Sequence, residues 1–203
     1  NANKLVMHEL PASVKTIKTM AFENCKSTGF NEFTVHNNVE TIEEAVFRGT
    51  DNLETLALPF VGQQRGINDE NVDTNEMFGW VYGYVSGDAN TNLSYSIEPA
   101  LKNVTITDDT VIGTEAFENV VMLQTLNTET VELIMPYAFN GCKNLKYMNK
   151  TDEANFVLPL SLTSIGDYAF NNCDSIISLI VSENVGEDDL GDYIFANCDS
   201  IIA

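Results

Sequence analysis

A short phenylalanine-centred pattern recurs along the chain, and it constrains the fold more than any other feature of the sequence. Six of the eleven phenylalanines have a small or aliphatic residue before them, Asn or Gly two positions after them, and then a small residue. Neighbouring copies lie 22 or 25 residues apart where the array is regular. Such a period indicates a solenoid, in which each repeat buries its apolar side chains against its neighbours. The six are Phe22, Phe47, Phe117, Phe139, Phe170 and Phe195.

Two further steps keep the same register as the phenylalanines. An apolar-x-x-apolar step precedes most copies, as at Val14 and Ile17. A second segment of the form L-x-x-L-x-L lies between copies, as at Leu53, Leu56 and Leu58. The alternation of its last two apolar positions is typical of a half-buried strand. The sequence therefore predicts a ladder of short parallel strands, one from each repeat.

Joined together, these steps resemble the BspA-like class of bacterial leucine-rich repeats. The best copy runs from Leu158 to Cys173 and reads LPLSLTSIGDYAFNNC. The resemblance implies an α/β right-handed, horseshoe-like solenoid, with parallel strands on one face and short turns or helical turns on the other. It also implies an extracellular or cell-surface bacterial protein used for binding or adhesion. We expect one array of about seven repeats over residues 1–203, with an expanded repeat at about 59–100.

The repeat positions have structural interpretations. The phenylalanines are expected to form the spine of the core, and the Asn or Gly two residues later suits a turn with positive φ. All four cysteines occupy one repeat position, which Thr50 and Val120 fill in other copies. A position that accepts Cys, Thr or Val requires a small buried side chain. We therefore expect reduced, buried thiols, and neither a disulfide nor a metal site. The four are Cys25, Cys142, Cys173 and Cys198.

The acidic composition excludes several classes of function. The net charge is -20 and the isoelectric point is near 4.1, which disfavours binding to nucleic acids and to anionic membranes. It suits a cationic partner or simple solubility. No apolar run approaches the length of a membrane span. The sequence has no nucleophile elbow, zinc-protease motif or phosphate-binding loop. We expect no enzyme activity, no cofactor and no membrane insertion.

The long interval between Leu58 and Leu101 contains an alternation of aromatic residues. Phe78, Trp80, Tyr82 and Tyr84 are separated by Gly or Val, so an extended backbone would place the four rings on one side. Two interpretations remain open: the rings form a lid over the solenoid edge, or an exposed platform for a glycan or peptide. Just upstream, Asp69, Asn71 and Asp73 match the start of a calcium loop. That loop lacks its glycine and its bidentate glutamate, so we expect a solvated acidic loop.

The exposed strand positions supply a second set of candidate binding residues. They are rich in Thr and Asn, which suits a neutral polar ligand and equally an ordinary solvated sheet. Binding to a protein or glycan of a host or bacterial surface is the leading hypothesis, and the alternative is a structural spacer. The chain stops at Ile201-Ile202-Ala203, so we also expect a longer natural array or edge-to-edge self-association. The candidate residues are Thr34, Thr105, Asn127, Tyr147 and Asn149.

Overall fold

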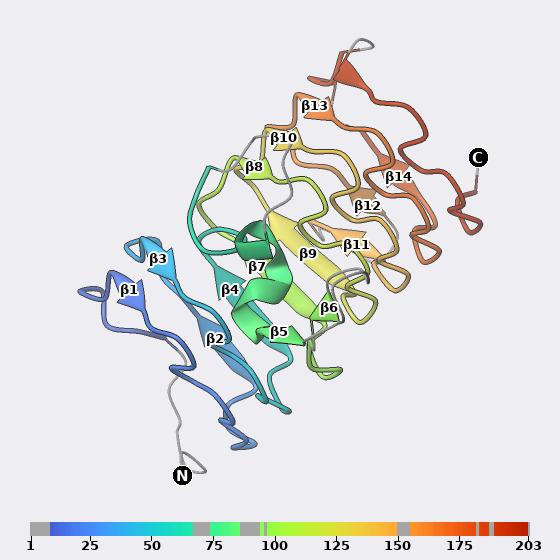
Figure 1. Ribbon diagram of the computed structural model, residues 1–203. Coiled ribbons are helices and arrows are strands. Elements are labelled where there is room, and N and C mark those ends of the chain that lie inside the picture. The colour runs from blue at the N-terminus through green and yellow to red at the C-terminus, as the bar shows by residue number, and fades with distance from the viewer. Residues whose placement is uncertain are drawn as a thin grey trace.

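The computed structural model is a stack of turns joined by short parallel strands (Figure 1). It describes residues 9–66, 74–85, 94–95, 97–149, 155–181, 183–186 and 189–202. The largest sheet has five parallel strands in the order β11-β9-β7-β4-β2. The strands lie side by side in the order in which they occur along the chain, so each repeat adds one strand next to that of the preceding repeat. The strands are β2 (Glu32–Thr34), β4 (Thr55–Leu58), β7 (Asn103–Ile106), β9 (Thr125–Thr128) and β11 (Tyr147–Met148).

The register of this sheet confirms the strand pattern predicted from the sequence. The central apolar position of each repeat forms one inward column, and every member of that column is buried. Stacking these positions removes their side chains from water, which a single repeat could not do alone. The column runs through Phe33, Leu56, Val104, Leu126 and Met148.

The apolar-x-x-apolar steps form a second row of short parallel strands. The row is divided into two sheets, because the expanded repeat falls between β3 and β8. The five-stranded sheet is continuous across the same point, since β4 pairs directly with β7. The expanded repeat therefore lies between β4 and β7 in sequence but does not separate these two strands in the five-stranded sheet. The second row comprises β1 (Thr16–Ile17), β3 (Thr41–Ile42), β8 (Val111–Ile112), β10 (Leu133–Ile134) and β13 (Ser164–Ile165).

Two further pairs complete the strands. β12 (Phe156–Val157) pairs in parallel with β14 (Leu179–Ile180). β5 (Tyr84–Val85) and β6 (Ser94–Tyr95) form an antiparallel pair inside the expanded repeat. Helix is almost absent: in the described ranges it is confined to the 3-10 helices η1 (Thr74–Glu76) and η2 (Phe78–Tyr82). The parallel solenoid is confirmed, but the helical half of the expected α/β class is not supported. Turns take its place.

The phenylalanine column is the spine of the core. Phe117, Phe139, Phe170 and Phe195 stack with ring centroids 5.0–5.2 Å apart and planes within 15° of parallel. The backbone N–H groups of Phe117, Phe139 and Phe170 donate to the neighbouring turn, as from Phe139 to Ala169 at 2.7 Å. Stacked rings of this kind bury large apolar areas and add a favourable ring–ring term.

Both sides of each repeated phenylalanine have left-handed backbone. The Asn or Gly two residues after it has positive φ in every copy, as predicted. The residue two positions before it also has positive φ, between 55° and 59°, although none is glycine. Left-handed backbone costs about 1–2 kcal/mol for an ordinary residue, and hydrogen bonds to the adjacent turn offset that cost. Those residues are Met20, Ala45, Glu115, Tyr137, Tyr168 and Tyr193.

The four cysteines are free, in agreement with the prediction. Cys142, Cys173 and Cys198 each direct Sγ at the carbonyl of the phenylalanine in the preceding turn, at 3.0–3.2 Å. Burial raises the thiol pKa of all three. Cys198 differs in being only half-buried, since it lies in the last turn of the described chain.

Helix η2 of the expanded repeat lies in the middle of the solenoid (Figure 1). Its rings join the two halves of the phenylalanine column. Tyr82 takes the ring position next to Phe47 at 6.4 Å, and Phe78 takes the position next to Phe117 at 4.8 Å. The expected extended segment is therefore wrong: residues 78–82 form a helical turn. Phe78 and Tyr82 are both fully buried in the core, with ring centroids 5.9 Å apart.

Candidate functional site

The exposed face of the five-stranded sheet brings together the predicted strand residues. Thr34, Thr105 and Asn127 lie in one register row across β2, β7 and β9, with Ala57 between the first two. Tyr147 lies in the adjacent row beside Thr125. Asn149 follows β11 and donates its N–H to the Leu126 carbonyl at 2.9 Å. The five residues thus share a face but do not form one compact cluster.

The aromatic residues of the expanded repeat lie apart from this face. Phe78 and Tyr82 are fully buried in the core. Trp80 is half-buried, and its indole N–H donates to the Ile42 carbonyl at 2.8 Å. Tyr84 contributes its backbone to β5. The calcium-like segment 69–73 lies outside the described residues. The structure therefore directs two of the four rings into the core.

A hollow of about 200 Å³ opens at the carboxyl ends of β7 and β9. It contains two of the predicted binding residues, Thr105 and Asn127. The side chains around it are mainly threonines, which present methyl groups and hydroxyls together. Glu129 and Thr130 at its rim are exposed. The full lining is Thr105, Ile106, Thr107, Asn127, Thr128, Glu129 and Thr130.

Thr128 is the unusual residue of this hollow. Its side chain is 1% exposed, and its hydroxyl has no hydrogen-bond partner among the described residues. Neighbouring strands place Leu58 and Ile106 in the same register row. A buried hydroxyl without a partner costs about 1–3 kcal/mol. Thr128 is thus an unpaired polar group in an otherwise apolar column.

The hollow exists because β11 is shorter than β9. β11 pairs only with Thr125 and Leu126, so the last two residues of β9 lack a strand partner on that side. The side chain of Asn149 replaces the missing strand: its Oδ1 accepts the Thr128 N–H at 2.6 Å. Asn149 has a φ of 46°, which turns the chain away from the sheet. The end of β9 therefore has no described strand beside it on that side.

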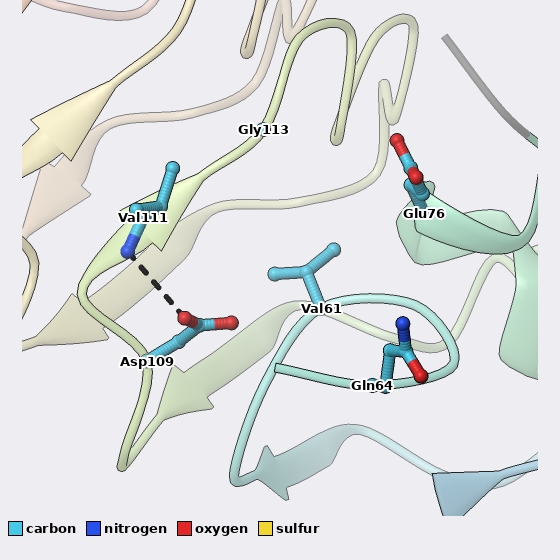
Figure 2. Close-up of a pocket in the computed structure, with 6 residues that line it drawn as sticks. All are labelled: Val61, Gln64, Glu76, Asp109, Val111 and Gly113. Carbon is cyan, nitrogen blue, oxygen red and sulfur yellow. Dashed lines mark hydrogen bonds between the residues drawn. The ribbon is translucent and has the colours of Figure 1, made fainter. Parts of the chain in front are cut away.

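A second, much smaller cavity lies where the expanded repeat meets β8 (Figure 2). At about 10 Å³ it has room for about one water molecule. Asp109 beside it is 5% exposed, and its Oδ1 accepts N–H groups of Gly66, Thr110 and Val111 at 3.0–3.5 Å. Burial raises the pKa of this carboxyl group. Asp109 therefore fastens the expanded repeat to the solenoid.

The described part of the chain offers no cluster of metal-ligating side chains. No group of three or more His, Cys, Asp or Glu residues there could hold a metal ion. No described helix has the length and apolar character needed to cross a membrane. The hollow beside β9 is the candidate site because it is much larger than the cavity beside Asp109 and has an unpaired buried hydroxyl among its lining residues.

Sequence reasoning named Thr105 and Asn127 but missed Thr128. A signal was available, because Thr128 stands at a strand position where Leu58 and Ile106 are apolar. What could not be foreseen was the early end of β11, which leaves Thr128 without a strand partner on that side.

Comparisons with known proteins agree with this geometry. The family model described as "BspA type Leucine rich repeat region" matches six copies, over residues 1–67 and 146–203. A leucine-rich repeat protein from Eubacterium ventriosum is similar in structure, with a TM-score of 0.59 and 17% identity. The match covers 96% of this chain and 43% of that one, so the chain spans less than half of that protein.

A second solved structure, the Leucine Rich Repeat protein of T. pallidum, gives a TM-score of 0.49 and 16% identity. That match covers 96% of this chain and 77% of that one. No curated protein matches the chain. At these identities the structural likeness concerns the fold.

Proposed function

The chain belongs to the family of BspA-type leucine-rich repeat proteins, and from that premise we propose that it is a non-catalytic binding scaffold of a bacterial surface or secreted protein. The proposed site is the exposed face of the five-stranded sheet, centred on the hollow at the ends of β7 and β9. The proposed ligand is neutral and rich in hydroxyl groups, for which a glycan is the best fit. Extracellular location is part of the same proposal.

The observation that carries this proposal is the hollow at the ends of β7 and β9, whose lining residues include Thr128 with its unpaired buried hydroxyl. Proteins rarely bury a polar group without a partner, and each such case calls for an explanation. A ligand hydroxyl would supply the missing hydrogen bond. The cost of the empty site would then be recovered on binding.

The lining indicates the ligand class. The hollow is smaller than the roughly 300–1,000 Å³ of pockets that hold drug-sized molecules, so it suits one small unit of a larger ligand. Threonine methyl groups can pack on the apolar face of a sugar ring, and Thr105 and Asn127 add polar atoms beside it. The carboxylate of Glu129 at the rim is a further hydrogen-bond acceptor. A glycan extended along the sheet would place one sugar in the hollow.

The test begins with wild-type protein on glycan and matrix-protein arrays, followed by affinity measurements with the best glycan. Thr105→Val removes one hydroxyl from the hollow while keeping the β-branched shape. Thr125→Val is the matched control, because Thr125 lies on β9 but does not line the hollow. We expect Thr105→Val to weaken binding by about tenfold, equivalent to one hydrogen bond, and Thr125→Val to leave it unchanged. No glycan binding, or equal effects of both variants, would favour the spacer function.

A further inference from the structure

Three tyrosines, two exposed and one half-buried, form a stacked ladder on the turns that follow the second row of strands. Tyr137 and Tyr168 stack with centroids 5.1 Å apart and planes 6° apart, and Tyr168 and Tyr193 stack at 5.1 Å and 18°. All three occupy the position two residues before a core phenylalanine. Tyr137 is 37% exposed and Tyr193 is 65% exposed. The ladder therefore presents a row of ring edges and hydroxyls to solvent.

The fold does not require tyrosine at this position. Met20, Ala45 and Glu115 hold it in other turns, with the same positive φ. The backbone N–H of Glu115 donates to the next turn just as that of Tyr137 does. The turn geometry is thus independent of the ring. Three consecutive stacked aromatic rings, two of them exposed, exceed what the turns need, and exposed aromatic residues are characteristic of binding surfaces.

The part of the chain that carries Tyr168 and Tyr193 has an excess of negative charge. Residues 151–203 contain no Lys, Arg or His. The ion pairs among the described residues use carboxylates between Glu23 and Asp108, so none neutralises a carboxylate in this region. The acidic residues here are Asp152, Glu153, Asp167, Asp174, Glu183, Glu187, Asp188, Asp189, Asp192 and Asp199.

Two of these carboxylates adjoin the ladder. Asp167 and Asp192 directly precede Tyr168 and Tyr193, and both are exposed. The Oδ1 of Asp167 accepts the Asp192 N–H at 2.7 Å, which holds the two turns in register. Partial burial, the neighbouring tyrosines and then these two carboxylates raise the pKa of the Tyr168 hydroxyl. Carboxylates and phenol oxygens therefore lie together along one line of successive turns.

We propose that this ladder, Tyr137, Tyr168 and Tyr193 with Asp167 and Asp192, binds an arginine-containing basic segment of a partner protein. A guanidinium group donates several N–H groups to carboxylate and hydroxyl oxygens and packs well against aromatic rings. The local excess of negative charge attracts a cationic segment and speeds its association. The same charge opposes pairing of this surface with a second copy of itself. The surface is separate from the hollow at β9, so it does not depend on the proposed glycan function.

The experiment measures binding of a labelled, flexible peptide of alternating arginine and serine by fluorescence anisotropy. A lysine peptide and a glutamate peptide of the same pattern serve as probes of chemistry. The ladder variant replaces all three tyrosines with alanine, which the repeat already accepts at Ala45. We expect the arginine peptide to bind more tightly than the lysine peptide. The ladder variant should lose about tenfold or more in affinity, as expected for a binding hot spot.

The charge test uses two double variants of equal net charge. Asp167→Asn with Asp192→Asn removes the ladder carboxylates, and the asparagine at 167 can still accept the Asp192 N–H. Asp174→Asn with Asp199→Asn is the matched control, since both carboxylates follow the phenylalanine instead of preceding the tyrosine. We expect the first pair to weaken peptide binding about tenfold and the second pair to change it less than about twofold. Melting temperatures of all variants establish that they are folded.

Two results would overturn the proposal. Equal losses in both double variants, with the tyrosine variant unaffected, would reduce the interaction to net charge. Dimerisation of the wild type that disappears in the tyrosine variant would assign the ladder to a second copy of the chain. Thr128→Val should retain peptide binding, which separates this test from that of the hollow.

Discussion

Replacing Thr128 with valine should stabilise the protein while weakening its ligand binding. Valine keeps the shape of threonine and removes a hydroxyl that is 1% exposed and unpaired in the described structure. Burying such a hydroxyl costs about 1–3 kcal/mol. Leu58 and Ile106 occupy the same register row, so the position accepts an apolar side chain. We expect Thr128→Val to raise the free energy of unfolding by about 1–2 kcal/mol.

Thr50→Val is the matched control, with the opposite expected sign. Thr50 is also fully buried, but its hydroxyl donates to the Phe47 carbonyl at 2.7 Å. Its repeat position already holds valine at Val120, so shape alone does not exclude the substitution. Loss of the hydrogen bond should cost about 1 kcal/mol. In a chain of this length 1 kcal/mol corresponds to about 2–4 °C in melting temperature.

Calorimetry of the wild type and both variants measures the two signs directly. The reasoning predicts a higher melting temperature for Thr128→Val, a lower one for Thr50→Val, and weaker glycan binding only for Thr128→Val. Destabilisation by both substitutions would refute it, because the Thr128 hydroxyl would then have a partner in the free protein. Stabilisation without any loss of binding would remove Thr128 from the site.

Three further predictions concern the core and the expanded repeat. Phe170→Ala should cost about 3–5 kcal/mol, measured by denaturant unfolding, because Phe170 is fully buried between two stacked rings; a change below about 1 kcal/mol would contradict its place in the spine. Native alkylation followed by mass spectrometry should modify half-buried Cys198 before Cys142 and Cys173, and equal rates would contradict the burial order. Because burial raises the pKa of Asp109, its protonated form favours folding, and its ionisation lowers stability as pH rises through the folded-state pKa. Asp109→Asn should therefore be at least as stable as wild type at pH 7 in thermal melts, with a difference that shrinks toward acid pH; a variant that is less stable at every pH would contradict this.

The regular part of the fold could be predicted because it repeats. The same apolar spacing recurs in each repeat, so many positions independently predict the strand rows and the phenylalanine column. Positive φ after the phenylalanine was also predictable, since Asn and Gly favour it. Positive φ before it was not, because Met20, Ala45 and the three tyrosines have no such preference. There the fold imposes the conformation, and hydrogen bonds between turns maintain it.

The tyrosine ladder could not be predicted from the sequence, because it depends on contacts between successive turns. Tyr137, Tyr168 and Tyr193 lie 25 or 31 residues apart in sequence, and only the stacking of turns brings their rings to 5.1 Å. The alternation of Phe78 and Tyr82 indicated an extended segment, but the need to fill two ring positions in the core favoured a helical turn instead.

Two lengthened repeats each contact the repeat before them with one segment and the repeat after them with another. In the first, Tyr82 continues the column from Phe47, and Phe78 starts it again beside Phe117. Glu98 supports the junction, because its carboxylate accepts the Gly49 N–H at 3.1 Å where other turns use a backbone carbonyl. The repeat thus presents one segment to each neighbour.

The second lengthened repeat contacts its two neighbours through two short strands. β11 pairs with β9 on one side, and β12 pairs with β14 on the other. Asn149, directly after β11, has a positive φ. Thr128 has no strand partner on that side of β9. In a solenoid, an insertion therefore changes the surface mainly where a neighbouring turn ends early, and the candidate hollow lies at such a place.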